Sequence, residues 1–398
     1  PLSPEIQTAL GIEANELEPN ELIQAILKAP VELLWNGGIG TYVKASTQTN
    51  QEVGDRNNDL LRIDATELRC KVVGEGGNLG FTQLARIEFA LNDGQICTDA
   101  IDNSAGVDCS DHEVNIKILL NEAMRQGLLD LDARNNLLTT MEQEVGALVL
   151  SDNYHQTQTI SNGINQSSTG TTYIRVLREL ERENFINRSL EALPGDKILR
   201  ARIAQNKSFT KPEFSVLMAY IKNTIKELVL QSDIPEDKYF EKYLALAFPK
   251  VLSEQYYKAM LNHPLKREII VTQLINQLVQ YLGIAYIHRM YDEVGASPAM
   301  SSRAFAIVIE LFDVEAIWQE IEALDGKVPA LVQINMMNEI TDFLHHQCRW
   351  ILSHYRLDLD IKTVTKYFKE GCQEVFKVTR NYLNADQKAF RAQMIANY

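Results

Sequence analysis

Residues 71–118 read KVVGEGGNLGFTQLARIEFALNDGQICTDAIDNSAGVDCSDHEVNIKI. The pattern predicts a strand, a glycine-rich loop, a helix, a short strand, a polar loop and a second helix. Most of the residue types that could bind a ligand fall in the loops, and α/β proteins place their binding sites on loops at the ends of a rigid scaffold. This stretch therefore sets both the expected fold and the expected site.

Three short apolar runs of the chain are predicted strands. They cover residues 31–35, 70–73 and 95–97 and alternate with helical patterns, which favours a parallel sheet. An opening strand followed by GxGxxG is not found, so we expect only part of a doubly wound, Rossmann-like sheet. Residues 1–150 are therefore predicted to be the C-terminal half of a dinucleotide-binding domain, and the chain to be a piece of a longer protein.

The second half of the chain has a different character. Residues 151–172 are rich in Asn, Gln, Ser and Thr and predict a polar linker. Residues 173–398 predict an all-α bundle. Its first strong marker is the capping box from Thr210 to Glu213. Later helical patterns cover Leu265–Glu293, Pro298–Phe312, Val314–Leu324, Pro329–Tyr355 and part of 361–383, with one more near the C-terminus. The expected class is α/β plus all-α.

Composition limits the possible partners. The chain has 398 residues, 45% hydrophobic and 23% charged, which is typical of a soluble globular protein. A formal net charge of −14 argues against nucleic acid or an anionic membrane as a partner. Five scattered cysteines favour reduced thiols and a cytoplasmic location. No apolar run approaches the roughly 20 residues that span a bilayer.

Two glycine pairs, Gly37-Gly38 and Gly76-Gly77, each follow a predicted strand. A single glycine cluster is more often an ordinary turn than a site. Two clusters after parallel strands lie at the same edge of a sheet, where exposed backbone N–H groups bind phosphates or a ribose. With the polar loop at 103–106, the site and the turn interpretations are about equally supported on physical grounds.

Ser110-Asp111-His112-Glu113 has the pattern of a capping box, which predicts that a helix begins at Ser110. A helix N-terminus also favours a carboxylate or phosphate nearby. A structural role for His112 is favoured over a catalytic one, because the second His of a zincin motif is missing. The cluster His345, His346, Cys348 and His354 lies in one helical pattern without a second ligand pair, so no metal site is predicted.

Four segments, 33–44, 72–80, 102–113 and 210–220, resemble the large bacterial NAD-specific glutamate dehydrogenases. The resemblance covers nearly the whole chain and implies the C-terminal portion of such an enzyme, which oxidises L-glutamate with NAD and water to 2-oxoglutarate, ammonia and NADH. It implies NAD as cofactor, glutamate or 2-oxoglutarate as ligand, and a homo-oligomer in the full-length protein. The family's catalytic lysine, substrate-binding lysine and catalytic aspartate lie upstream of the matched region, so no catalytic residue is expected here.

The resemblance also implies site residues. Residues 75–85, EGGNLGFTQLA, are similar to the motif EGANGPTTPEA in the cofactor domain of the small glutamate dehydrogenases. This match implies four residues near the nicotinamide ribose: Glu75, Gly76, Gly77 and Asn78. The family's NAGGV motif matches residues 103–107, which implies that Asn103 lies near the carboxamide. Ser110 falls on the serine that binds the substrate's side-chain carboxylate. The loop beside the cofactor is implied to be Asn36, Gly37 and Gly38.

A second hypothesis stays open at this point. The chain would then be a non-catalytic oligomerisation or regulatory module of a larger protein, with the α/β part incidental. The sequence identifies neither an effector, nor the oligomeric state, nor the role of the helical region. It also does not separate NAD from NADP, because the acidic residue that reads the ribose 2′-hydroxyl would lie upstream.

Overall fold

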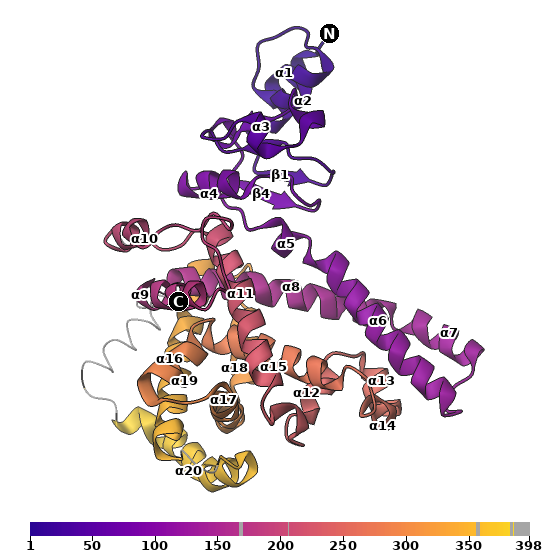
Figure 1. The fold of residues 1–398 in the computed structure, drawn as a ribbon, viewed down its shortest axis with the longest axis vertical. Helices are drawn as coiled ribbons and strands as arrows, with labels where there is room; N and C mark the ends of the chain where they lie inside the picture. Colours follow the sequence, from indigo (N-terminus) through magenta and orange to yellow (C-terminus); the bar gives the residue numbers. More distant parts are fainter. Residues whose placement is uncertain (167–169, 206, 356–358, 383–384, 386–398) are drawn as a thin grey trace. The chain divides into compact units, whose positions relative to one another are not determined.

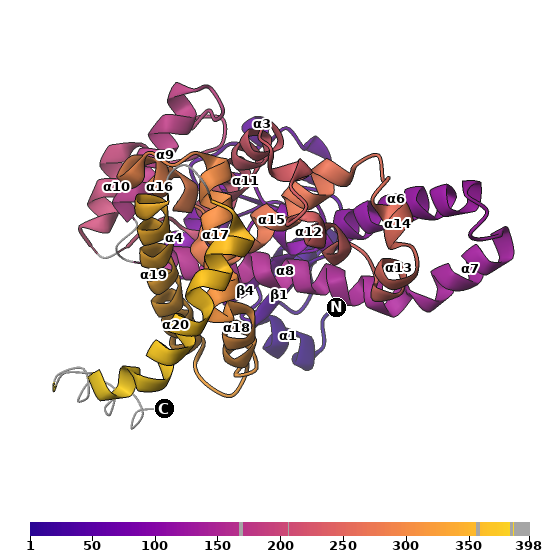
Figure 2. The same cartoon turned by 90° about the horizontal axis from the view of Figure 1, so that it is seen from below.

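The computed structural model describes residues 1–166, 170–205, 207–355, 359–382 and 385. The chain forms two compact units, Pro1–His288 and Arg289–Tyr398. Each unit is considered by itself below, with the elements labelled as in Figures 1 and 2.

The first unit begins with short α and β elements. They are α1 (Pro4–Leu10), α2 (Pro19–Leu27), β1 (Leu33–Asn36), β2 (Val43–Lys44), α3 (Asn50–Val53), η1 (Arg56–Asn58), β3 (Ile63–Asp64), η2 (Ala65–Glu67), β4 (Val72–Glu75), α4 (Gln83–Leu91) and α5 (Asp99–Asp102). Helices then follow: α6 (Ser104–Arg125), α7 (Leu131–Thr140), α8 (Glu142–Asn165), α9 (Gly170–Arg182), α10 (Asp196–Ile203), α11 (Lys211–Leu230), η4 (Ile234–Glu236), α12 (Glu241–Leu246), α13 (Lys250–Gln255), α14 (Tyr257–Met260) and α15 (Lys266–Leu282).

Strands β1 and β4 pair in parallel, with Leu33 opposite Val72 and Asn36 opposite Glu75. Both strands therefore end at the same edge, as the glycine clusters predicted. The expected third strand at 95–97 is reduced to one parallel bridge between Gln95 and Val72. Strands β2 and β3 form a separate two-stranded sheet. Within the described residues, the parallel pairing is present but a doubly wound sheet is not.

A small apolar core holds these strands against α4. Thr82 is the N-cap of this helix, and its hydroxyl accepts a hydrogen bond from the Ala85 amide, which satisfies one of the free donors of the first turn. The inward face of α4 then buries Ala85 and Phe89 beside Val73 of β4. This packing fixes where β4 ends, and so fixes the glycine loop that follows.

The expected polar linker at 151–172 is wrong over most of its length. Residues 151–165 belong to α8 and residues 170–172 to α9, while 167–169 lie outside the described residues. The reason is burial: Ile160 is fully buried, and a Cβ on Gly163 would lie 2.2 Å from the Phe214 ring, so α8 and α11 are in close contact. Tertiary packing overrides the polar composition here.

The predicted capping box at α11 is confirmed. The Thr210 hydroxyl accepts from the Glu213 amide, and the Glu213 carboxylate accepts from the Thr210 amide at 2.7 Å. Arg202 donates to both oxygens of the same carboxylate. Helix α11 packs on α4, α8 and α15, so it joins the α/β part of this unit to its helices.

The second unit contains α17 (Pro298–Phe312), α18 (Val314–Glu322), α19 (Ala330–His354) and α20 (Ile361–Tyr382). Helix α17 packs against α19 and α20. Helix α16 (Tyr286–Val294) spans the division between the units. The single helix predicted for 265–293 is broken into α15 and α16 at Gly283, whose φ of +72° ends α15. The last predicted helix falls on residues outside the described part of the chain.

Among the described residues, none of the helices alone has the length and apolarity to cross a membrane; α15 and α16 reach that criterion only when the bent pair is counted together.

Candidate functional site

The two glycine loops meet at the ends of β1 and β4. The Gly77 amide donates to the Asn36 carbonyl at 3.0 Å. A Cβ on Gly77 would lie 2.4 Å from the Gly38 carbonyl oxygen, a separation that no side chain tolerates. Glycine is therefore required at 77 for the loops to touch. The convergence expected from the sequence is present, and Gly37, Gly38 and Gly76 are exposed.

Trp35 covers the second glycine loop from the side of β1. Cβ atoms on Gly74 and Gly76 would each lie 2.6 Å from its indole ring. The ring thus rests directly on the backbone of β4 and the start of the loop, and yet Trp35 remains 60% exposed. An aromatic face next to two exposed glycine segments is a surface on which a planar ligand group can stack.

Glu75 does not face the loop surface, although the family motif implied that it lies by the cofactor. Its side chain is fully buried and receives two hydrogen bonds from Arg86, at 2.7 and 3.0 Å. Its Oε1 also accepts from the Phe81 amide at 3.1 Å. Burial by itself would lower the pKa of the Arg86 guanidinium. The adjacent carboxylates together have the larger effect in the opposite direction, so this pKa is raised. Glu75 therefore shapes the loop from inside.

Two further carboxylates complete this support. Asp99 Oδ2 lies 3.3 Å from Arg86 and accepts from the Leu79 amide at 2.8 Å. Asp102 Oδ2 accepts from the Glu75 amide at 3.0 Å. The end of β4 and the middle of the glycine loop are thus tied to α5, at Glu75 and at Leu79. Leu79 is held at a φ of +61°, an uncommon conformation for a branched residue.

The tip of the loop carries two amides. Asn103 Nδ2 donates to Asn78 Oδ1 at 2.5 Å. Asn78 is exposed and Asn103 half-buried, so both present polar atoms at the surface. On β1, the Nδ2 of Asn36 is buried without a hydrogen-bond partner among the described residues. The structure therefore brings together residues 36–38, 76–78 and 103. At least one of their donors, Asn36 Nδ2, has no hydrogen-bond partner among the described residues.

Ser110 is not a helix N-cap, and this prediction is wrong. Helix α6 already begins at Ser104, so Ser110 lies inside it with an exposed hydroxyl that donates to the Gly106 carbonyl at 3.1 Å. Glu113, the expected second half of the capping box, pairs with Lys117 instead. Ser110 is therefore not at a helix N-terminus, and the expectation that a helix N-terminus favours a carboxylate beside it is wrong. The serine remains seven residues from Asn103, about two helical turns along the same face.

The opposite face of α6 carries a group of ionisable side chains. Asp108 and Asp152 share a hydrogen bond, and His112 Nε2 lies 3.9 Å from Asp108 Oδ1. The ligand atoms of these three residues lie within 4.8 Å of one another. Burial and the Asp152 charge raise the pKa of Asp108 to about 6. Burial lowers the pKa of Lys222 to about 8, opposed by the same two carboxylates.

His112 has a structural environment, as expected. It is buried, and its Nδ1 lies 3.0 Å from the Ala247 carbonyl, which fixes the ring between α6 and the residues after α12. The negative charges of Asp152 and Asp108 favour the ammonium form of Lys222. The location of this ionisable group behind α6 makes it a support of the helix that presents Asn103 and Ser110.

Sequence reasoning missed three residues that hold the loop: Arg86, Asp99 and Asp102. One pattern could have pointed to the first. Arg86 interrupts the buried face of α4 between Ala85 and Ile87, and a buried arginine needs a carboxylate partner. The sequence does not identify Glu75 as that partner, because the motif match puts Glu75 in the exposed loop.

Comparison with known proteins gives matches along most of the chain. The family described as bacterial NAD-glutamate dehydrogenase, catalytic domain, matches residues 1–163, and glutamate dehydrogenase, C-terminal, matches residues 206–398.

Three curated relatives carry the name NAD-specific glutamate dehydrogenase. The Pseudomonas aeruginosa protein is 46% identical over 368 residues, which is 92% of this chain and 23% of that protein. The Halomonas elongata protein is 45% identical over the same shares. The Mycobacterium tuberculosis protein is 38% identical over 405 residues, 100% of this chain and 25% of that protein. The chain thus spans about a quarter of the length of the curated relatives it matches.

Proposed function

Because the chain belongs to the bacterial NAD-specific glutamate dehydrogenases, we propose that it supplies part of the cofactor and substrate site of an enzyme that oxidises L-glutamate to 2-oxoglutarate and ammonia. The observation that carries the proposal is the meeting of two glycine loops and two amides at the carboxyl ends of β1 and β4. This is the edge at which parallel sheets bind their ligands.

The residues at this edge fit NAD. Exposed glycines give a flat ligand group access to the backbone, and Asn36 Nδ2 is a buried donor without a partner among the described residues. Residues 36–38 and 76–78 would lie along the ribose and nicotinamide, and Asn103 would orient the carboxamide. Bound nicotinamide supplies the hydride acceptor; the residues of this chain bind it and orient it.

Ser110 is proposed as the contact for the side-chain carboxylate of glutamate. Its hydroxyl is exposed on α6, and the helix places it on the same face as Asn103. Asn103 immediately precedes α6 and Ser110 lies within it, so a substrate held by Ser110 keeps a fixed position relative to a ring held at Asn103.

The β1–β4 pair is proposed to be part of a larger doubly wound sheet. Strand β4 is followed by α4, as in a βα unit, and β1 is paired only with β4 among the described residues. Leu33 and Trp35 on β1 are 53% and 60% exposed, and Val72 on β4 is 40% exposed. Apolar side chains on a strand at the edge of a sheet are normally covered by further structure.

A cytoplasmic location and assembly into a homo-oligomer are also proposals. The first rests on the five cysteines, all free in the structure. The second rests on the resemblance alone and is tested by the mass of the purified full-length protein in solution.

The functional proposal is tested by steady-state kinetics on a polypeptide of the relatives' length that contains this chain. Asn78→Asp should raise KM for NAD and Ser110→Ala should raise KM for glutamate, each about 10- to 100-fold, the value of a hydrogen bond to a charged or polar ligand group. Ser189→Ala, an exposed serine in a turn, is the matched control. An unchanged KM for glutamate in Ser110→Ala would sink the substrate assignment, and an unchanged KM for NAD in Asn78→Asp the cofactor assignment.

A further inference from the structure

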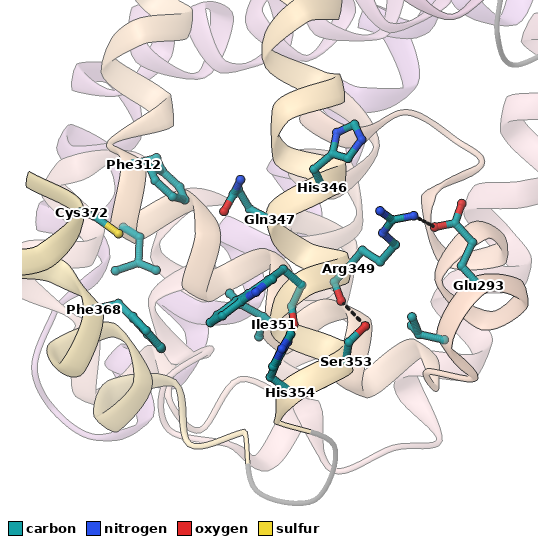
Figure 3. A pocket seen from close by; sticks show the side chains of 13 residues that line it. Glu293, Phe312, His346, Gln347, Arg349, Ile351, Ser353, His354, Phe368 and Cys372 are labelled. Atoms are coloured by element: carbon teal, nitrogen blue, oxygen red, sulfur yellow. Dashed lines mark hydrogen bonds and ion pairs between the residues drawn. The ribbon is translucent and has the colours of Figure 1, made fainter. Parts of the chain in front are cut away.

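The second unit contains a cavity of about 770 Å³ that the proposed enzyme site does not use (Figure 3). It is lined by residues of α16, α17, α19 and α20 that all belong to this unit. The volume lies within the range of about 300–1,000 Å³ found for small-molecule pockets.

One side of the cavity is aromatic and apolar. Trp350 stacks on His354 with ring centroids 4.4 Å apart and meets Phe368 edge-on at 5.6 Å. Figure 3 shows Phe312, Phe368 and Cys372 on this side. Trp350 is nevertheless 44% exposed, so a large aromatic face opens into the cavity. Covering it would remove apolar surface from water.

The other side carries charge, as Figure 3 shows for Arg349 and Glu293. Arg349 Nη1 lies 3.7 Å from Glu293 Oε2, which is too long for a hydrogen bond. The other oxygen of Glu293 lies 3.4 Å from two nitrogens of Arg289. Two guanidinium groups therefore share one carboxylate. Within the described part of the chain, the guanidinium of Arg349 donates no hydrogen bond, and its side chain is 51% exposed.

The two histidines that line the cavity each contact a backbone carbonyl of their own helix, α19. His346 Nδ1 lies 2.7 Å from the Asp342 carbonyl, and His354 Nδ1 lies 2.7 Å from the Trp350 carbonyl. Because a carbonyl only accepts hydrogen bonds, each Nδ1 donates its proton within the helix and is not available to a ligand. Arg349 is thus the donor that a negatively charged ligand would find here.

We propose that this cavity binds a small-molecule carboxylate with an aromatic or other apolar body. The carboxylate pairs with the free fork of Arg349, and the body covers Trp350 and Phe368. Arginine suits this role because its planar N–H donors match a carboxylate in two parallel hydrogen bonds. The proposal does not depend on the proposed enzymatic function, since it uses only residues of the second unit.

Calorimetric titration of the 398-residue chain tests the proposal with ligands that share one naphthalene body. They are 2-naphthylacetate, its alcohol 2-(2-naphthyl)ethanol and its amine 2-(2-naphthyl)ethylamine. The acid should bind at least about tenfold more tightly than the alcohol, since a charge-assisted pair replaces a neutral contact. Arg349→Met should abolish this preference. Lys362→Met, which removes an exposed charge of α20 away from the cavity lining, should retain it.

The proposal is overturned if acid and alcohol bind equally, if the amine binds best, if none of the three binds, or if Arg349→Met keeps the preference for the acid with an unchanged melting temperature. A fourth ligand, 3-(2-naphthyl)-L-alanine, separates two sources of the carboxylate. Affinity equal to that of the acid supports an amino acid, with its ammonium on Glu293; weaker affinity supports a carboxylic acid without an amine. Trp350→Leu should weaken acid and alcohol by the same factor, and a loss confined to the acid contradicts the aromatic wall.

Discussion

Arg86 donates to both carboxylate oxygens of Glu75 in a place where the two side chains are 5% and 0% exposed. A residue of the cofactor-loop motif thus points into the protein, and the loop takes its shape from an ion pair beneath it.

Arg86→Met should destabilise the first unit by about 3–5 kcal/mol, because it leaves the buried Glu75 carboxylate without its positively charged partner. Urea unfolding followed by circular dichroism measures the change. Arg178→Met is the control, since Arg178 pairs with Asp196 at a half-exposed position and such pairs contribute about 0–1 kcal/mol. Equal losses in the two variants would show that the Glu75 pair is not a structural support.

Gly77→Ala should separate the two glycine loops, because its Cβ would meet the Gly38 carbonyl at 2.4 Å. We expect a loss of about 1–3 kcal/mol in stability and, in the full-length enzyme, a higher KM for NAD. Gly37→Ala is the matched control: its nearest neighbour, Trp35 Nε1, is 3.5 Å from the built Cβ, an ordinary contact. A Gly77→Ala protein as stable as the control contradicts the proposed contact.

Two glycines of α8 provide a test within one helix. Gly163→Ala places a Cβ 2.2 Å from the Phe214 ring, whereas Gly146→Ala meets nothing within 4 Å. The first should destabilise by about 1–3 kcal/mol. The second should stabilise by about 0.5–1 kcal/mol, since alanine restricts the unfolded chain and favours the helix. Thermal melts compare the two variants, and a shift of the same sign in both would argue against close packing of α8 on α11.

Asp108→Asn should change how stability depends on pH. Burial and the Asp152 charge raise the pKa of Asp108 from 3.8 to about 6. The folded state therefore holds a proton that the unfolded state has released between these values, so stability falls as pH rises from 4 to 6. The asparagine variant should lack this fall and be about 1–2 kcal/mol more stable than the native chain at pH 7, with its partial exposure taken into account.

Urea midpoints at pH 4.5 and 7 measure this effect. Lys222, with a pKa lowered to about 8, contributes in the opposite sense only above that pH, outside the measured window. Asp132→Asn, an exposed aspartate of α7 that is not among the charges acting on Asp108, is the control and should follow the native chain. Parallel pH profiles for Asp108→Asn and the native chain would contradict the shared proton.

Patterns with a local physical cause were predictable from the sequence. The capping box at Thr210 was confirmed because both of its hydrogen bonds lie within four residues. The sequence predicted that the two glycine loops lie at one edge of a sheet. Each loop follows an apolar segment, and the alternation of strands with helices favours parallel pairing of these segments. The sequence did not predict that the third strand, at 95–97, would be reduced to one bridge at Gln95. The extent of strand pairing depends on the neighbouring strands and not on the residues of that segment alone.

The errors share a different cause. Ser110 has capping-box chemistry, but the helix begins six residues earlier, at Ser104, whose hydroxyl accepts from Asn153 of α8. The expected linker is polar in composition, but Ile160 and Gly163 pack inward. Glu75 looks like a loop residue, but Arg86 turns it inward. In each case the deciding partner is distant in the chain or on another helix.

Within the described part of the chain, β1 pairs only with β4, and its open edge has a consequence for work with the chain by itself. A strand that offers its free backbone groups and two outward apolar side chains, Leu33 and Trp35, is a template for the same strand of another molecule. Concentrated samples should therefore form soluble aggregates that light scattering detects and that carry no biological meaning. Leu33→Lys, a charge placed on the edge strand in the way natural sheets protect theirs, should keep the preparation monodisperse.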